Sequence, residues 1–94
     1  MTDTSVFFRI HAVQRMFERE VAVKNVIQAL EFGETLEDYS DEMPEPGRLI
    51  LAYQGRRPFH VVASGSSKTN ETTIITVYLP TLDQWKRDFK TRRR

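Results

Sequence analysis

Three side chains that can handle a phosphate group recur at four-residue intervals near the N-terminus: His11, Arg15 and Arg19. On an α-helix this spacing brings them to one face, about 6 Å apart along the axis. An arginine guanidinium binds two phosphate oxygens at once, and a histidine can give or take a proton near neutral pH. The row therefore suits phosphoryl chemistry, and it fits at least as well an ordinary polar helix face whose arginines pair with nearby acids.

The second histidine, His60, stands inside a strongly apolar run. If residue 64 pairs near residue 72, His60 lies opposite Thr76 and diagonal to Tyr78 on one face of a sheet. An imidazole, a hydroxyl and a phenol would then lie together, with the helix row as a candidate neighbour. The alternative is a partly buried histidine that bonds a backbone carbonyl.

The net charge of +1 conceals an uneven distribution of charge along the chain. Segment 31–45 holds seven acidic residues and no Lys or Arg, whereas segment 86–94 holds six basic residues and one acid. Candidates for contact with nucleic-acid phosphates are Arg15, Arg19, Lys86, Arg87, Lys90 and Arg92. The alternative for the C-terminus is a solvated tail, frayed over residues 91–94.

A chain of 94 residues, 39% of them hydrophobic, can fill one compact domain spanning 1–94 and is too short for two. No apolar run approaches the roughly 20 residues of a membrane helix, so we expect no membrane partner, no signal sequence and a cytoplasmic location. The lack of cysteine excludes thiolate chemistry, and the two histidines offer no metal-ligand spacing. Since no glycine-rich nucleotide motif occurs, we also expect no metal and no cofactor.

The apolar residues of the N-terminal half predict two helices joined as a hairpin. At 100° per residue, Ala12, Val13, Met16 and Phe17 fall on one side of the first helix. The second helix has apolar residues at i, i+3, i+4 and i+7, namely Val23, Val26, Ile27 and Leu30. We expect it to end at Gly33 in a left-handed conformation.

The C-terminal half predicts a small sheet. Segments 48–54, 58–64 and 72–79 have the composition of strands, and their short links require antiparallel pairing. A shorter strand follows Gly33, the stretch 39–47 is typical of a loop, and 5–10 is an edge strand or the lead into the first helix. After Pro80, a capping-box spacing and an apolar stripe predict a short C-terminal helix. The fold class is α+β: an αα-hairpin on an antiparallel sheet of three to four strands.

Six groups of residues, taken in order, resemble a known family. They are His11-Ala12 with Arg15-Met16 and Glu18-Arg19; Gly33-Glu34 with Glu37-Asp38-Tyr39; Leu49 and Leu51; Pro58 with His60-Val61-Val62; Ile75-Thr76-Val77-Tyr78 with Pro80; and Trp85 with Asp88-Phe89. Over nearly the whole chain they resemble the domain-of-unknown-function family 4258 of bacteria. That family is regarded as related to compact RelE-type toxins, and its members are often encoded beside a small YgiT-type zinc-finger protein that looks like an antitoxin. The resemblance implies a RelE-like architecture with a curved sheet, and a candidate toxin of a type II toxin-antitoxin pair.

Two functions follow from these observations. The first is a metal-independent endoribonuclease, in which His11 or His60 supplies acid and base, Arg15 and Arg19 stabilise the phosphorane, and Tyr78 orients or donates a proton. Its partner would be RNA or the ribosome. The alternative is a non-enzymatic module that binds a protein, such as the zinc-finger antitoxin, or a nucleic acid. Such a module would dock through its acidic loop and basic tail.

Overall fold

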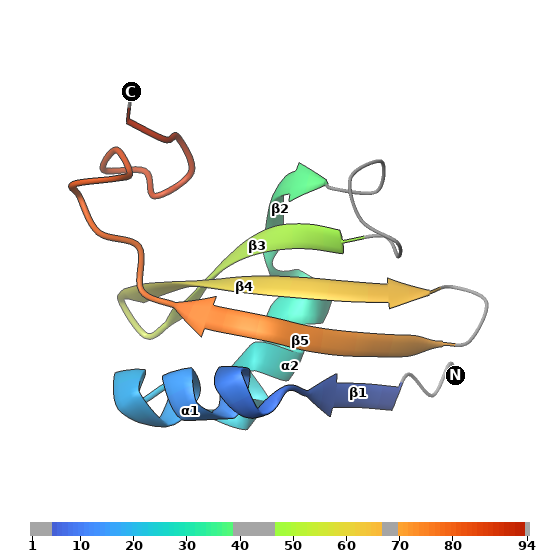
Figure 1. Ribbon diagram of the computed structural model, residues 1–94. Helices are drawn as coiled ribbons and strands as arrows, with labels where there is room; N and C mark the ends of the chain where they lie inside the picture. Colours follow the sequence, from blue (N-terminus) through green and yellow to red (C-terminus); the bar gives the residue numbers. More distant parts are fainter. Residues whose placement is uncertain (1–4, 39–46, 67–69, 94) are drawn as a thin grey trace.

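The computed structural model describes residues 5–38, 47–66 and 70–93, which form two helices and five strands (Figure 1). In chain order the elements are β1 (Ser5–Phe8), α1 (Ile10–Arg19), α2 (Val23–Phe32), β2 (Glu34–Asp38), β3 (Gly47–Gln54), β4 (Arg57–Ser66) and β5 (Glu71–Tyr78). The helix pair is confirmed, and the three predicted strands correspond to β3, β4 and β5 to within two residues at each end. Most of the predicted loop at 39–47 lies outside the described residues.

The five strands form one mixed sheet in the order β1-β5-β4-β3-β2. β1 runs parallel to β5, with Ser5 beside Glu71 and Phe8 beside Ile74, whereas the other pairs are antiparallel. The predicted antiparallel sheet of three to four strands is therefore wrong. The short links between β3, β4 and β5 do require antiparallel pairing, but the connection from β1 to β5 contains most of the chain and is long enough for parallel pairing.

The predicted short C-terminal helix is also wrong, because the described residues after β5 form turns. The Asp88 carboxylate accepts hydrogen bonds from the backbone N–H groups of Lys90 and Thr91, and Phe89 has a left-handed φ of 57°. A side chain that satisfies nearby backbone donors competes with helix formation. We call residues 80–93 the C-terminal cover.

The sheet separates two layers. α1 packs on β5 and α2 packs on β3, on the same face of the sheet. Along β4, Phe59, Val61 and Ala63 face the helices. His60 lies between them in the alternation and faces the other side, where the Trp85 ring of the C-terminal cover contacts it. The buried members of the core are Ala12, Met16, Val21, Val26, Ala29, Ile50, Phe59, Val61, Ala63, Ile74 and Val77.

A bulge in β5 determines which of its side chains enter this core. The register of β4 against β5 shifts between Val62 and Ala63, which leaves Ile75 as an extra residue. Because of this extra residue, Ile74 and Val77 both face the helices, although strict alternation would send them to opposite faces.

The tip of the β3–β4 hairpin holds the junction between the helices. The Gln54 side chain accepts a hydrogen bond from the Ala22 N–H at 3.0 Å and donates one to the Glu20 carbonyl at 2.8 Å. Arg57 donates to the carbonyls of Arg19 and Glu20, both at 2.6 Å. A cationic donor thus satisfies carbonyls that the end of α1 leaves without a partner.

Gly33 follows α2 in an extended conformation, with φ −72° and ψ 165°, so the predicted left-handed residue is wrong. A Cβ at this position would overlap the Ile50 side chain and the Ala29 carbonyl. The glycine is required because the chain passes close to β3 as it turns from α2 into β2.

Candidate functional site

The structure divides the five residues of the predicted nuclease site between two faces. His11, Arg15 and Arg19 lie on α1, which packs on the helix-covered face of the sheet. His60 and Tyr78 are paired on β4 and β5 and face the C-terminal cover on the opposite side. The described structure therefore forms no single site from these five side chains.

His11, Arg15 and Arg19, which we call the α1 row, have the features of a polar helix face. His11 and Arg19 are exposed, and Arg15 is partly exposed. The Arg15 Nη1 donates to Glu18 Oε1 at 3.0 Å, and both side chains are about half exposed to solvent. A surface pair of this kind contributes a few tenths of a kcal/mol to helix stability.

His60 is completely buried, and both of its ring nitrogens have partners. Nε2 lies 2.8 Å from the Phe89 carbonyl oxygen, and Nδ1 lies 3.1 Å from the Tyr78 hydroxyl. Because a carbonyl can only accept, Nε2 carries the hydrogen, and Nδ1 accepts from the tyrosine. Tyr78 lies directly opposite His60, where the predicted register has Thr76. One residue of this difference comes from the bulge in β5, and the other comes from the pairing of Ser64 with Thr73 in place of residue 72. His60 thus matches the alternative given from sequence, a buried histidine that bonds a backbone carbonyl.

Burial also favours the neutral forms of His60 and Tyr78. The pKa of His60 is lowered chiefly by burial, although the hydrogen bond to the Phe89 carbonyl raises it. Burial likewise raises the pKa of the Tyr78 hydroxyl. The Trp85 ring, itself buried, meets the imidazole edge-on at a centroid distance of 4.5 Å. With both ring nitrogens engaged, His60 offers no free nitrogen to a substrate while the cover is in place.

Ion pairs to β2 hold the far end of the C-terminal cover. The Arg92 guanidinium donates to both oxygens of Glu37, at 2.9 and 3.2 Å, and lies 4.6 Å from the Trp85 ring centroid. Lys90 pairs with Glu34 at 3.0 Å, and that hydrogen bond raises the lysine pKa. Two of the predicted nucleic-acid contacts are thus engaged within the chain.

The other residues of the basic C-terminus lie differently. Lys86 and Arg87 are exposed. The Arg93 backbone N–H donates to the Gln84 carbonyl, and its Nε donates to the carbonyls of Leu82 and Trp85. Residues 91–93 are therefore held by hydrogen bonds, and Arg94 lies outside the described residues.

The helices expose an apolar surface that the sequence interpretation missed. Ala12 and Met16 are buried, but Val13 and Phe17, which were predicted on the same side, are 50% and 87% exposed, and Ile10 is 77% exposed. On α2, Val23 and Ile27 are also exposed. We call Ile10, Val13, Phe17, Val23 and Ile27 the apolar helix surface. The signal was present, because the apolar residues of α1 span about 160° of the helix, more than one core-facing stripe needs.

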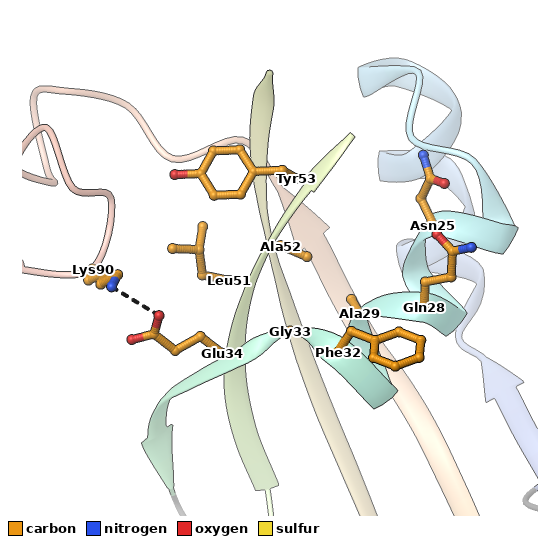
Figure 2. A pocket seen from close by; sticks show the side chains of 10 residues that line it. All are labelled: Asn25, Gln28, Ala29, Phe32, Gly33, Glu34, Leu51, Ala52, Tyr53 and Lys90. Atoms are coloured by element: carbon orange, nitrogen blue, oxygen red, sulfur yellow. Dashed lines mark ion pairs between the residues drawn. The ribbon is translucent and has the colours of Figure 1, made fainter. Parts of the chain in front are cut away.

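A pocket of about 490 Å³ lies at the outer edge of β3 (Figure 2). It is lined by Asn25, Gln28, Ala29, Phe32, Gly33, Glu34, Leu51, Ala52, Tyr53 and Lys90. Figure 2 shows Tyr53, Leu51 and the Lys90–Glu34 ion pair on one side of β3, and Phe32 with the α2 amides on the other. No sequence motif indicated this pocket, because its residues are distant along the chain.

Comparison with known proteins yields one family. The model of the family described as a domain of unknown function, DUF4258, matches residues 8–79. Neither the curated proteins nor the solved structures contain a significant match to the chain. Among the described residues, no helix is long and apolar enough to cross a membrane, and no group of three or more His, Cys, Asp or Glu side chains is arranged to hold a metal ion.

Proposed function

The chain belongs to the DUF4258 family, and from the geometry of its surface we propose that it is a protein-binding module. The observation that carries the proposal is the apolar helix surface. Its side chains recur at i, i+3 and i+7 on α1 (Ile10, Val13, Phe17) and at i, i+4 on α2 (Val23, Ile27). The linker of residues 20–22 joins the end of one stripe to the start of the other.

Exposed apolar side chains that stand singly are normal, but a run of them at helical spacing on each of two successive helices is typical of an interaction site. Covering one phenylalanine side chain is worth roughly 2 kcal/mol, so Phe17 alone would contribute appreciably to an interface. The surface follows two helices, which suits a partner helix that lays apolar residues along it.

The net charge of the segment around α1 favours a partner other than a second copy of the chain, although Arg15 and Arg19 point to the side of α1 opposite Phe17. Over residues 9–24 the basic side chains are Arg9, Arg15, Arg19 and Lys24, and the acidic ones are Glu18 and Glu20. A symmetric dimer would bring two segments of the same net charge together, whereas an acidic helix would be attracted to this segment. We therefore propose an acidic, amphipathic helix of another protein as the partner.

This proposal accommodates the toxin hypothesis but not its nuclease mechanism. If the chain is the toxin of a toxin-antitoxin pair, its antitoxin is the partner that would cover the apolar helix surface. The endoribonuclease hypothesis lacks comparable support, because His60 and Tyr78 are separated from the α1 row by the sheet. RNA cleavage in the presence of EDTA, lost in Arg15→Ala with the fold intact, would restore it.

The binding proposal is tested by co-expressing the chain with the product of the neighbouring gene and measuring the Kd of the purified pair. Phe17→Ala should weaken binding at least about tenfold, the loss typical of an interface hot spot. The matched control is Leu82→Ala, which removes a half-exposed apolar side chain from the C-terminal cover and should leave the Kd unchanged. Equal binding by both variants, or self-association of the chain that Phe17→Ala abolishes, would overturn the proposal.

A further inference from the structure

The outer edge of β3 is paired along only part of its length. β2 begins at Glu34, which pairs with Leu51, so β3 extends past the end of β2 from Ala52 to Gln54. On its other side, β3 remains paired with β4 up to Gln54 opposite Arg57. This open stretch of edge borders the pocket shown in Figure 2.

The ladder between β3 and β4 determines which backbone groups point outward. Antiparallel pairs alternate between those that exchange two hydrogen bonds and those that exchange none. Tyr53 is opposite Pro58, which has no N–H and cannot take part in a two-bond pair. The Tyr53 N–H and C=O therefore point away from β4, to the open side. Leu51, two residues earlier, has the same orientation and meets β2 there.

The pocket beside the Tyr53 N–H and C=O has the lining expected of a groove that binds an extended strand. On the side of Tyr53, the floor is apolar at Leu51, and the rim carries the Lys90–Glu34 pair. On the opposite side, Phe32 is 81% exposed, and the Gln28 and Asn25 amides line the same side of the pocket (Figure 2). Alternate side chains of a strand laid along the edge would enter these two compartments in turn.

We propose that this edge of β3 binds an extended peptide segment, which pairs with the backbone of Tyr53 and continues the line of β2. The residue opposite Tyr53 lies on the side of Leu51 and the tyrosine ring, so a β-branched apolar residue fits there. Its two neighbours lie on the side of Phe32. The site is independent of the apolar helix surface and goes beyond the binding function proposed above.

An extended peptide fits this site better than a small ligand does. The outward N–H and C=O of Tyr53, beyond the end of β2, are spaced to pair with a strand, and the pocket beside them is partly open to solvent rather than enclosed. Sheet edges left open are sites at which other chains add strands.

Amide exchange and a peptide titration, both followed by NMR, test the inference. The probe is the acetylated and amidated pentapeptide Thr-Ile-Thr-Ile-Thr. Without peptide, the Tyr53 amide should exchange rapidly, while the amides of Ala52 and Gln54, which point toward β4, should be protected. Addition of peptide should shift the Tyr53 signal saturably and slow its exchange. Unchanged exchange and shifts at Tyr53 at millimolar peptide would overturn the proposal.

Two substitutions isolate the backbone donor. Tyr53→Pro and Tyr53→Thr both remove the ring, but only proline removes the outward N–H, a position at which an edge strand tolerates it. Tyr53→Pro should bind the peptide about five- to tenfold more weakly than Tyr53→Thr, the effect of one net hydrogen bond. Equal affinities would contradict strand pairing.

Two further measurements keep the peptide-binding test valid if Tyr53→Pro does not fold, or if the helix-binding proposal fails. If Tyr53→Pro does not fold, the unmodified protein is titrated with a peptide N-methylated at each position in turn. Loss of binding at one position supports the pairing, and no loss at any position refutes it. Phe17→Ala should bind the peptide normally, so that failure here and failure of the helix-binding proposal are distinguishable.

Discussion

The two faces of the sheet are covered in opposite ways. On one face lie two regular helices, yet Phe17 and Ile10 remain largely exposed beside the core that these helices build. On the other face lies a segment of turns, and beneath it Trp85 is 1% exposed and His60 is completely buried. None of the buried side-chain N and O atoms in the described residues lacks a hydrogen-bond partner.

A layer can therefore be regular in secondary structure and still leave apolar side chains exposed, and an irregular layer can bury them completely. The C-terminal cover is irregular but closed, because its carbonyls, cations and indole find partners on the sheet, such as His60 and Glu37. The helix layer is regular but leaves an apolar flank on each helix. We expect stability to depend strongly on the cover, and binding to depend on the helix surface.

The largest effect on stability should come from Trp85→Ala. Removing a buried tryptophan leaves a cavity against His60 and removes the platform of the Arg92 guanidinium, so the free energy of unfolding should fall by about 3–5 kcal/mol. Urea unfolding followed by far-UV circular dichroism measures this loss. A loss below about 1 kcal/mol would show that the cover contributes little to folding.

We expect an intermediate effect on stability from His60→Gln. The substitution removes a buried imidazole whose two nitrogens both have hydrogen-bond partners. One lost hydrogen bond to a buried group should reduce stability by about 1–3 kcal/mol. The variant should also alter the pH dependence. Because the pKa of His60 is lowered in the folded chain, the unfolded chain binds a proton first as the pH falls below about 6.5.

The sign of that pH dependence can be measured. In the unmodified protein the free energy of unfolding should fall between pH 7.5 and pH 5.5, and in His60→Gln this part of the dependence should disappear. His11→Gln is the control, since His11 is exposed on α1 and the slope should persist. If the dependence of the unfolding free energy on pH vanished in His11→Gln instead, the titrating histidine would be His11, and the prediction would be wrong.

The elements with a strong local pattern were predictable from sequence, and the contacts that close the fold were not. The periodicity of the helices and the strand composition of β3, β4 and β5 identified these elements. β1 has only four residues, and its parallel partner β5 lies at the other end of the chain. The spacing of Thr81 and Gln84 suggested a helix, but the burial of Trp85 and the Asp88 turn determined the path of the cover.

The candidate site was predictable only in part for the same reason. The α1 row is where its spacing places it, but its relation to His60 depends on the face to which each residue of β4 points. Sequence alone favoured neither the catalytic nor the buried histidine. The open edge at Tyr53 depends on where β2 begins relative to Pro58, a tertiary property that no local pattern records.

The smallest effect on stability should come from Phe17→Ala. Its side chain is 87% exposed, and alanine favours the helix slightly, so the free energy of unfolding should change by less than about 0.5 kcal/mol or rise. Met16→Ala, one position earlier and 4% exposed, should lose about 2 kcal/mol or more in the same urea experiment. Equal losses in the two variants would mean that Phe17 is covered in solution. A near-zero change combined with the expected loss of partner binding would show that Phe17 serves the interface and contributes nothing to the fold.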